Sequence, residues 1–170
     1  MKLFKGKEEV DFIIIKASDE DIGFCVDRMT RALGNQSVNR EILEQTLKTP
    51  NVIVLVAKVK EKIVGVITGL AFPSLIPPPR IDFLDVSDEE SAKKGLPYRL
   101  IDGFIEELKK RVPNATYVDT NVSASNPNYV AMYSLKGFLV AGFTKGEKPI
   151  GDTIVLRKNV SSEASTSYTV

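Results

Sequence analysis

Residues 126–138 read Asn126-Pro-Asn-Tyr129-Val-Ala-Met-Tyr133-Ser-Leu-Lys-Gly137-Phe138. An asparagine followed by proline is typical of a helix start, so the stretch predicts a short helix over residues 126–135. Gly137 and Phe138 then lead into a strand over residues 139–143. Asn126 and Tyr133 are two helical turns apart, so we expect their side chains on roughly the same face of this helix.

The chain before and after this unit shows strand and helix patterns in a definite order. Apolar, β-branched runs predict strands at residues 10–16, 51–59, 63–72, 80–86, 115–121 and 153–157. Apolar residues at helical spacing predict helices with stripes over residues 22–33, 38–47 and 96–112. The charged tip at residues 60–62 predicts a hairpin, and the helix at 96–112 predicts a crossover between two strands. We therefore expect an α+β fold, with a mixed central sheet of about seven strands flanked by about four helices.

Length and composition fit a single domain. The chain has 170 residues, of which 43% are hydrophobic and 26% charged, and its formal net charge is +1. We expect one domain over residues 1–160 and a polar, flexible tail over residues 161–170. Because no block of like charges occurs, and no apolar run approaches the roughly 18 residues of a membrane helix, we expect no nucleic acid or membrane partner. These features are typical of a cytoplasmic protein.

The residue types that are missing exclude several kinds of chemistry. The chain has no histidine and one cysteine, Cys25, so it has no internal disulfide, and we expect no metal site of the usual zinc type. Ser-His-Asp and Cys-His nucleophile systems are excluded as well. Cys25 belongs to an apolar helical stripe, which favours a core residue over a reactive thiol. A catalytic base must therefore be a carboxylate, a tyrosine, a lysine or water.

The spacing N-x6-Y-x3-G-F, with the order of elements before it, resembles the GNAT superfamily, the Gcn5-related N-acetyltransferases, over about residues 12–158. The resemblance implies an enzyme that transfers the acetyl group of acetyl-CoA directly to a primary amine of a small molecule, peptide or protein. It implies that Asn126 contacts the pantetheine arm and that Tyr133 is the general acid to the departing thiolate. From spacing alone, Asn126 is equally well a helix cap and Tyr133 a core residue.

The resemblance also implies where the donor binds. Main-chain groups of Leu84, Asp85 and Val86 near the end of strand 80–86 would pair with the pantetheine as if it were an added strand. The pyrophosphate would lie at the start of helix 96–112, where free N–H groups and about half a positive charge are found. The residues predicted for this second contact are Lys93, Lys94, Gly95, Leu96 and Tyr98.

Two positions in this turn depart from the family pattern. Ala92 stands where the family has arginine or glutamine, and Pro97 stands where it has a small residue with a free N–H. Proline suits the first turn of a helix, so the helix start itself is retained. Without the resemblance, the stretch is an ordinary loop with a solvated pair of lysines.

The base and the acceptor are less determined. Asp82 and Asp85 lie three residues apart on strand 80–86, so a period of two predicts opposite faces, and we expect Asp85 to be the base because it is nearer the thioester. An ion-paired or solvent-facing role for both carboxylates, with water as the base, remains open. Weaker candidates on the next strand are Tyr117, Asp119 and Thr120. We expect loop 73–79 and the first two helices to line the site of the amine acceptor.

Two other functions remain open from the sequence. One is a catalytically weak GNAT-like domain that binds an acyl-CoA or a partner as a sensor, which the departures at Ala92 and Pro97 motivate. The other is an unrelated α+β enzyme with the same element order. The last two predicted strands also form a sheet edge that could pair with a second copy in a homodimer.

Overall fold

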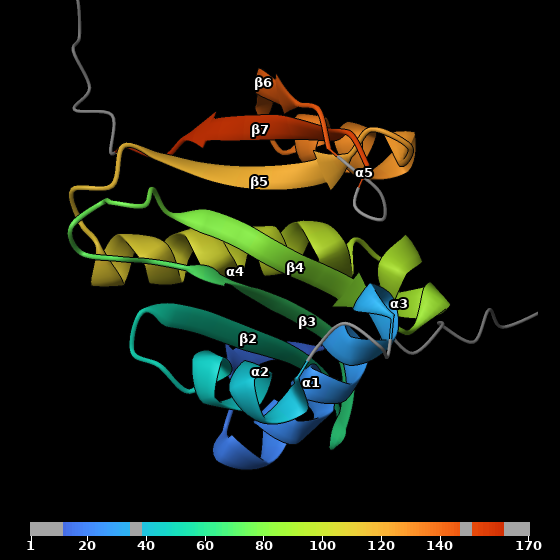
Figure 1. The fold of residues 1–170 in the computed structure, drawn as a ribbon. Coiled ribbons are helices and arrows are strands. Elements are labelled where there is room, and N and C mark those ends of the chain that lie inside the picture. The colour runs from blue at the N-terminus through green and yellow to red at the C-terminus, as the bar shows by residue number, and fades with distance from the viewer. Residues whose placement is uncertain (1–11, 35–38, 147–150, 162–170) are drawn as a thin grey trace, which may run out of the picture.

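The computed structural model describes residues 12–34, 39–146 and 151–161, and these form one sheet with helices on both faces (Figure 1). The strands are β1 (Ile13–Lys16), β2 (Val52–Val59), β3 (Lys62–Leu70), β4 (Arg80–Val86), β5 (Tyr117–Ser123), β6 (Leu139–Thr144) and β7 (Thr153–Asn159). The helices are α1 (Asp19–Leu33), α2 (Arg40–Leu47), α3 (Glu89–Lys93), α4 (Leu96–Arg111) and α5 (Pro127–Leu135).

The seven strands have the order β1-β2-β3-β4-β5-β7-β6. β4 and β5 are parallel, and the other neighbouring pairs are antiparallel. The predicted hairpin is β2–β3, the predicted crossover joins β4 to β5, and the last two predicted strands, β6 and β7, pair with each other. The α+β class and the mixed seven-stranded sheet are therefore confirmed.

Each face of the sheet has its own core. α1 and α2 cover the face at β2 and β3, and α4 covers the opposite face (Figure 1). Leu100, Ile101 and Phe104 of α4 are fully buried against the sheet. On the other face, Cys25 of α1 is fully buried, and burial together with the charge of Asp21 raises the pKa of its thiol to about 12. Cys25 is thus an inert core residue, as its place in the apolar stripe predicts.

The structure differs from the sequence predictions in a few elements. The sequence patterns predict no helix at α3, although Asp88 accepts a hydrogen bond from the Ser91 N–H as a helix cap and two glutamates follow it. β5 begins and ends two residues later than predicted, and β1 begins at Ile13. Parts of the predicted first strand and second helix, and all but residue 161 of the predicted tail over residues 161–170, lie outside the described residues.

β6 is an edge strand with several exposed apolar side chains. Leu139, Val140 and Phe143 are each more than half exposed, and β6 pairs only with β7 among the described strands. Such an edge suits association with a second chain, so the homodimer stays a prediction. Within the described segments, no helix has both the length and the apolar composition that a membrane span requires.

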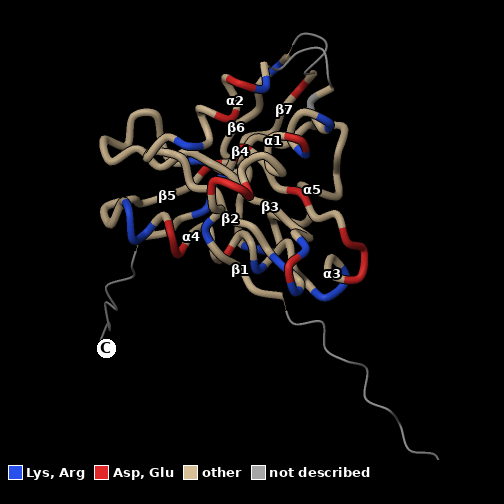
Figure 2. The backbone as a smooth tube through the Cα atoms, turned by 90° about the horizontal axis from the view of Figure 1, so that it is seen from below, with Lys and Arg blue, Asp and Glu red and all other residues tan. Residues whose placement is uncertain are grey.

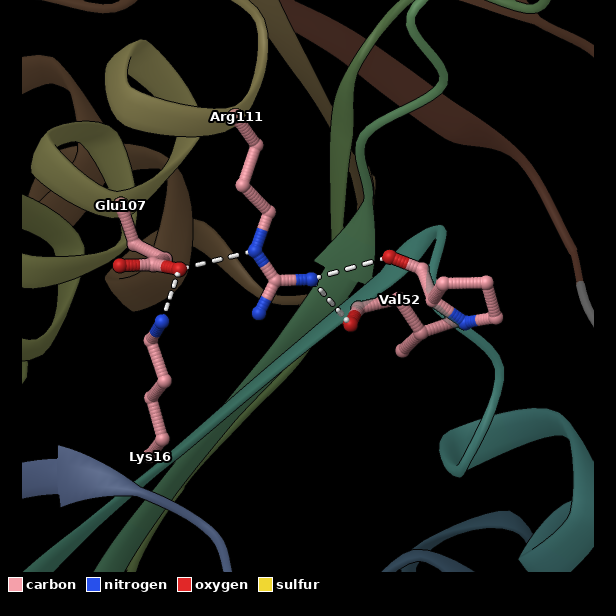
Figure 3. A network of polar contacts seen from close by, with 5 residues as sticks. Lys16, Val52, Glu107 and Arg111 are labelled. Atoms are coloured by element: carbon pink, nitrogen blue, oxygen red, sulfur yellow. Dashed lines mark hydrogen bonds and ion pairs between the residues drawn. The ribbon is translucent and has the colours of Figure 1, made fainter.

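A buried carboxylate fastens α4 to two strands. Glu107 on α4 is 6% exposed and accepts hydrogen bonds from Lys16 at the end of β1 and from Arg111 one turn later (Figure 3). Arg111 also donates to the carbonyls of Pro50 and Val52, where the chain enters β2. Burial alone would raise the pKa of Glu107, but the two cations lower it below its ordinary value. Glu107 is therefore charged at neutral pH and holds the end of α4 in place.

We expect Glu107→Gln to lower the free energy of unfolding by about 1–3 kcal/mol at pH 7, because charge-assisted hydrogen bonds to two cations are lost. The stabilisation is present above the unfolded-state pKa of a glutamate and disappears as the pH falls through the lowered folded-state pKa. Urea denaturation of the wild type and the variant measures the difference in their free energies of unfolding at pH 7 and at pH 3. An equal loss at the two pH values would contradict the account.

Candidate active site

A cleft opens where β4 and β5 separate. The two strands pair only at Arg80 with Asp119 and at Ile81 with Thr120, and beyond this point they diverge toward their C-terminal ends (Figure 1). The cleft has a volume of about 260 Å³. Its lining residues come from β4, β5 and α5: Asp82, Phe83, Leu84, Thr120, Asn121, Val122, Ser123, Asn126, Tyr129 and Tyr133.

A β-bulge in β4 accompanies this opening. Ile81 pairs with Gly69 of β3 and Phe83 pairs with Thr68, so Asp82 between them has no partner in the ladder. The extra residue reverses the alternation of side chains along the strand. Ile81 and Leu84 thus both belong to the core under α4, although they are three residues apart. The simple period of two, which predicted opposite faces for Asp82 and Asp85, fails here for this reason.

α5 brings the predicted Asn126 and Tyr133 to the cleft together. Asn126 stands at the N-cap position, but its side chain makes no capping hydrogen bond. Its amide lines the cleft and has no hydrogen-bond partner within the described part of the chain. An amide that does not cap its helix and faces a cleft is available to a ligand, which favours the binding role over the capping role.

Tyr133 is both a core residue and a cleft residue. It is 3% exposed, and its ring packs edge to face against Phe138 with centroids 5.1 Å apart. Burial raises the pKa of the phenol well above its ordinary value, and a hydrogen bond with Thr120 offsets part of this rise. The hydroxyl therefore stays protonated at neutral pH, and its proton is available to a ligand that replaces Thr120 as the acceptor.

The two carboxylates of β4 have different surroundings. Asp85, predicted as the base, accepts a hydrogen bond from Nε of Arg28 on α1 at 2.8 Å and a second one from Nη2, and it is not among the residues that line the cleft. Asp82 lines the cleft, and burial raises its pKa even though Arg80 lies 2.5 Å away and counteracts the rise. Asp82 is reachable from the cleft, and a carboxylate with a raised pKa is the better proton acceptor, so the geometry favours Asp82.

The weaker candidates on β5 have separate roles. Asp119 forms a two-pronged ion pair with Arg157 of β7, at 2.7 and 2.8 Å. The guanidinium of Arg157 lies 3.8 Å from the centre of the Tyr117 ring. Thr120 lines the cleft and donates its hydroxyl to the Ile81 carbonyl at 3.1 Å. Of these three, Thr120 is the one that takes part in the cleft.

Tyr129 is a cleft residue that the sequence predictions missed. It lies on α5, four residues before Tyr133, and its hydroxyl lies 3.4 Å from the carbonyl oxygen of Leu84 on β4. Its spacing from Tyr133 is the signal that could have identified it, because residues at i and i+4 share a helix face. Its side chain thus reaches from one wall of the cleft to the other.

The turn predicted to bind pyrophosphate joins α3 to α4. Gly95 has a positive φ of 83° and is the N-cap of α4, with Leu96 as the first helical residue. The N–H groups of Lys94, Gly95 and Tyr98 are bonded to the carbonyls of Glu90, Ala92 and Gly95. Leu96 N–H has no acceptor among the described residues. Of these four N–H donors, three are therefore engaged within the protein.

Charges of both signs meet at the same turn (Figure 2). Lys93 and Lys94 pair with Glu89 and Glu90, each one helical turn earlier in α3. Both side chains of the Lys93–Glu89 pair are widely exposed, and such surface ion pairs contribute little to stability. Either lysine can therefore exchange its glutamate for an anionic ligand. The two glutamates nevertheless reduce the positive field that the sequence led us to expect.

A larger groove lies elsewhere, between β1 and α4, with a volume of about 490 Å³. Its charged lining residues include Lys16 and Glu107, which the buried network already engages, and it contains none of the motif residues on α5. The free amide of Asn126, the phenol of Tyr133 and the edge of β4 beyond its pairing with β5 meet at the β4–β5 cleft, which makes it the stronger site.

Comparisons with known proteins bear on this architecture. No family model and no curated protein matches the sequence. Among solved structures, a GNAT-family acetyltransferase from Streptococcus pneumoniae is 20% identical, with a TM-score of 0.67, and the match covers 88% of this chain and 99% of that one. The ribosomal-protein-S18-alanine N-acetyltransferase of Escherichia coli is 16% identical, with a TM-score of 0.71 and coverage of 93% and 99%.

A third similar structure is a putative acetyltransferase from Salmonella typhimurium, solved with its cofactor acetyl-CoA. It is 15% identical, with a TM-score of 0.71 and coverage of 93% of this chain and 99% of that one. The present chain therefore has the fold of the GNAT superfamily, and the likeness extends over nearly the whole length of these acetyltransferases.

The residues of the cleft fit the thioester end of acetyl-CoA. The free amide of Asn126 and the protonated phenol of Tyr133 line a narrow cleft beside the part of β4 that does not pair with β5. The turn before α4 offers the pyrophosphate one free N–H group, at Leu96, and two exposed lysines. The chain thus offers better-placed groups for the thioester end of acetyl-CoA than for its nucleotide end.

Proposed function

We propose that this protein is an N-acetyltransferase that transfers the acetyl group of acetyl-CoA directly to a primary amine of a small molecule, peptide or protein. The observation that carries the proposal is the cleft between β4 and β5, where Asp82, Asn126 and Tyr133 converge. The three groups supply a proton acceptor, an amide and a proton donor, which are the parts that direct acyl transfer to an amine needs.

Acetyl-CoA supplies an acetyl group activated as a thioester. Leu84 and Val86 hold the pantetheine arm with backbone groups on the open edge of β4, and an N–H there stabilises the thioester oxygen as it gains negative charge, which is worth about 3 kcal/mol per donor. The Asn126 amide fixes the arm from the opposite wall. At the other end, Leu96 N–H, Lys93 and Lys94 contact the pyrophosphate beside Gly95 and Tyr98.

Proton transfers complete the reaction. Asp82, directly or through a water, takes a proton from the amine, whose nitrogen forms a bond to the acetyl carbon as the carbon–sulfur bond breaks. The Tyr133 hydroxyl donates a hydrogen bond to the departing sulfur, which leaves as a thiolate and then takes a proton from solvent to become the thiol, while Asp82 releases the amine's proton to solvent. Because the phenol pKa is raised, this stabilisation of developing negative charge contributes more than complete proton transfer from the phenol.

The second candidate is an acyl-CoA-binding sensor with weak catalysis. Two observations favour it, because each weakens binding of the nucleotide part of CoA. The N–H groups of Lys94, Gly95 and Tyr98 are already engaged, and α3 begins with acidic residues. Thermal unfolding with CoA and with acetyl-CoA, followed by a thiol-release assay on a panel of amines, separates the candidates. We expect stabilisation together with thiol release. Stabilisation without release would favour the sensor, and no stabilisation would contradict both.

Asn126 provides a test that separates binding from folding. We expect Asn126→Ala to weaken CoA binding about tenfold, which corresponds to one lost hydrogen bond of ~1.4 kcal/mol in a desolvated cleft. Its thermal stability should stay unchanged, because the side chain makes no capping bond. Isothermal titration calorimetry measures the first value and thermal unfolding the second.

Asn39 is the matched control for this test. Its side chain caps α2 by accepting from the N–H groups of Glu41 and Ile42. Asn39→Ala should therefore lower stability by about 1 kcal/mol and leave CoA affinity unchanged. The reverse pattern in the two variants would show that Asn126 is structural.

A further inference from the structure

Tyr129 occupies the cleft in a way that the proposed reaction does not use. Its phenol is 37% exposed, it lines the cleft, and its hydroxyl reaches from α5 to the carbonyl oxygen of Leu84 on β4. Burial and the nearby charge of Asp85 raise the pKa of this phenol, so the hydroxyl is protonated and acts as the donor. One side chain thereby connects two walls that are not joined by strand pairing at this level.

The carbonyl that Tyr129 contacts is on the open edge of β4. Alternate residues of a strand point their N–H and C=O groups to the same edge. Ser87, just after β4, donates its N–H to Val64, at the start of β3, so residues 85 and 87 face β3 while Leu84 and Val86 face the cleft. Pairing with β5 ends at Ile81, so no strand among the described residues satisfies these groups. An extended amide chain that adds to this edge needs the Leu84 carbonyl as an acceptor.

We infer that Tyr129 is a gate for the acyl donor: its phenol closes the cleft and occupies the Leu84 carbonyl that the pantetheine arm must use. The inference rests on the proposed function. Binding of the arm exchanges the phenol hydroxyl for a pantetheine amide at Leu84, and the side chain turns outward.

The contact is suited to exchange. At 3.4 Å the hydrogen bond is longer than the usual 2.7–2.8 Å between two oxygens and correspondingly weak. The ring is also partly exposed, so turning it outward does not unpack the core that holds Tyr133 one turn later. Tyr129 therefore lowers the affinity of the donor, whereas a side chain that merely contacted the donor would raise it.

A gate lowers the affinity for the donor and a contact residue raises it, so substitutions at Tyr129 distinguish the two roles. We expect Tyr129→Phe to bind CoA about threefold more tightly than the wild type, because removal of the hydroxyl frees the Leu84 carbonyl at the cost of one weak hydrogen bond. Tyr129→Ala should bind at least as tightly as Tyr129→Phe, because it removes the ring as well. Tyr117→Phe is the control, since its ring lies under Arg157 outside the cleft, and its affinity should equal that of the wild type.

Calorimetric titration with CoA and with pantetheine measures these affinities, and NMR of 13C-labelled tyrosine follows the ring. The gain in affinity should appear with both ligands, because the gate acts on the arm they share, and the Tyr129 ring signal should shift on binding. Binding to the wild type with equal or weaker binding to Tyr129→Phe would overturn the gate and leave the proposed function standing. Absence of CoA binding in all four proteins would overturn both.

Discussion

Tyr133→Phe should reduce turnover at least tenfold while the affinity for acetyl-CoA changes little. The hydroxyl is the only part removed, and it acts on the sulfur as negative charge develops there, so the loss falls on the transition state rather than on the bound donor. A general acid or charge-assisted donor typically contributes 10²-fold or more, so tenfold is a lower bound. Steady-state thiol release measures turnover, and calorimetry measures the affinity.

This substitution removes the hydroxyl without changing the packing of the ring. Phenylalanine retains the ring that packs against Phe138, so the buried core around α5 is preserved. Thermal unfolding of the variant should therefore remain close to that of the wild type. Turnover equal to the wild type would remove Tyr133 from the mechanism, whatever the affinity.

Asp82→Asn should combine a loss of activity with a gain in stability. The raised pKa means that the charged carboxylate is less favourable in the folded protein than in the unfolded chain. Its contribution to stability is complete below the unfolded pKa and is lost as the pH rises through the folded pKa, so a neutral amide should raise the unfolding temperature at pH 7. Turnover should fall at least tenfold, because the proton acceptor is gone.

The pH profile tests the same assignment. In the wild type, kcat/KM should rise with pH through the raised pKa of Asp82, and this limb should be absent in Asp82→Asn. At pH 3 the difference in stability between the two proteins should disappear, because Asp82 is protonated there in both states. A less stable variant at pH 7, or an unchanged profile, would contradict the role of Asp82.

Asp85→Asn is the matched control on the same strand. It weakens the ion pair with Arg28, so we expect a lower unfolding temperature, and turnover should stay near the wild-type value because the side chain is outside the cleft. A large loss of turnover in this variant alone would instead support the assignment of Asp85 as base that the sequence favoured.

The sequence predicted most of the fold because its signals are local. β4 has the predicted bounds, and the apolar stripe of α4 lies against the sheet as its spacing requires. α3 escaped prediction although Asp88 and the following glutamates are a helix-start signal, because five residues are too few to show an apolar stripe. The β6–β7 pair was predicted from two short runs, and the insertion of β7 between β5 and β6 became visible only in the sheet order.

The site was less predictable because its key features depend on pairing. The bulge at Asp82 arises from the register between β3 and β4, which no local pattern encodes, and it changes which carboxylate enters the cleft. The role of Asn126 depends on whether its amide caps α5, and that follows from the folded geometry of the residue and not from the local sequence. Tyr129 was overlooked because it carries no motif position, and its reach to Leu84 depends on the distance between α5 and β4.

A crystal structure of the protein with bound CoA is the most direct test of the central claim, which is that the β4–β5 cleft holds the thiol end of the donor. We predict that the pantetheine pairs with Leu84 and Val86, that its sulfur lies within hydrogen-bond distance of the Tyr133 hydroxyl, and that Tyr129 has left the Leu84 carbonyl. An empty cleft, or CoA bound elsewhere while Tyr133 stays sealed in the core, would contradict the account.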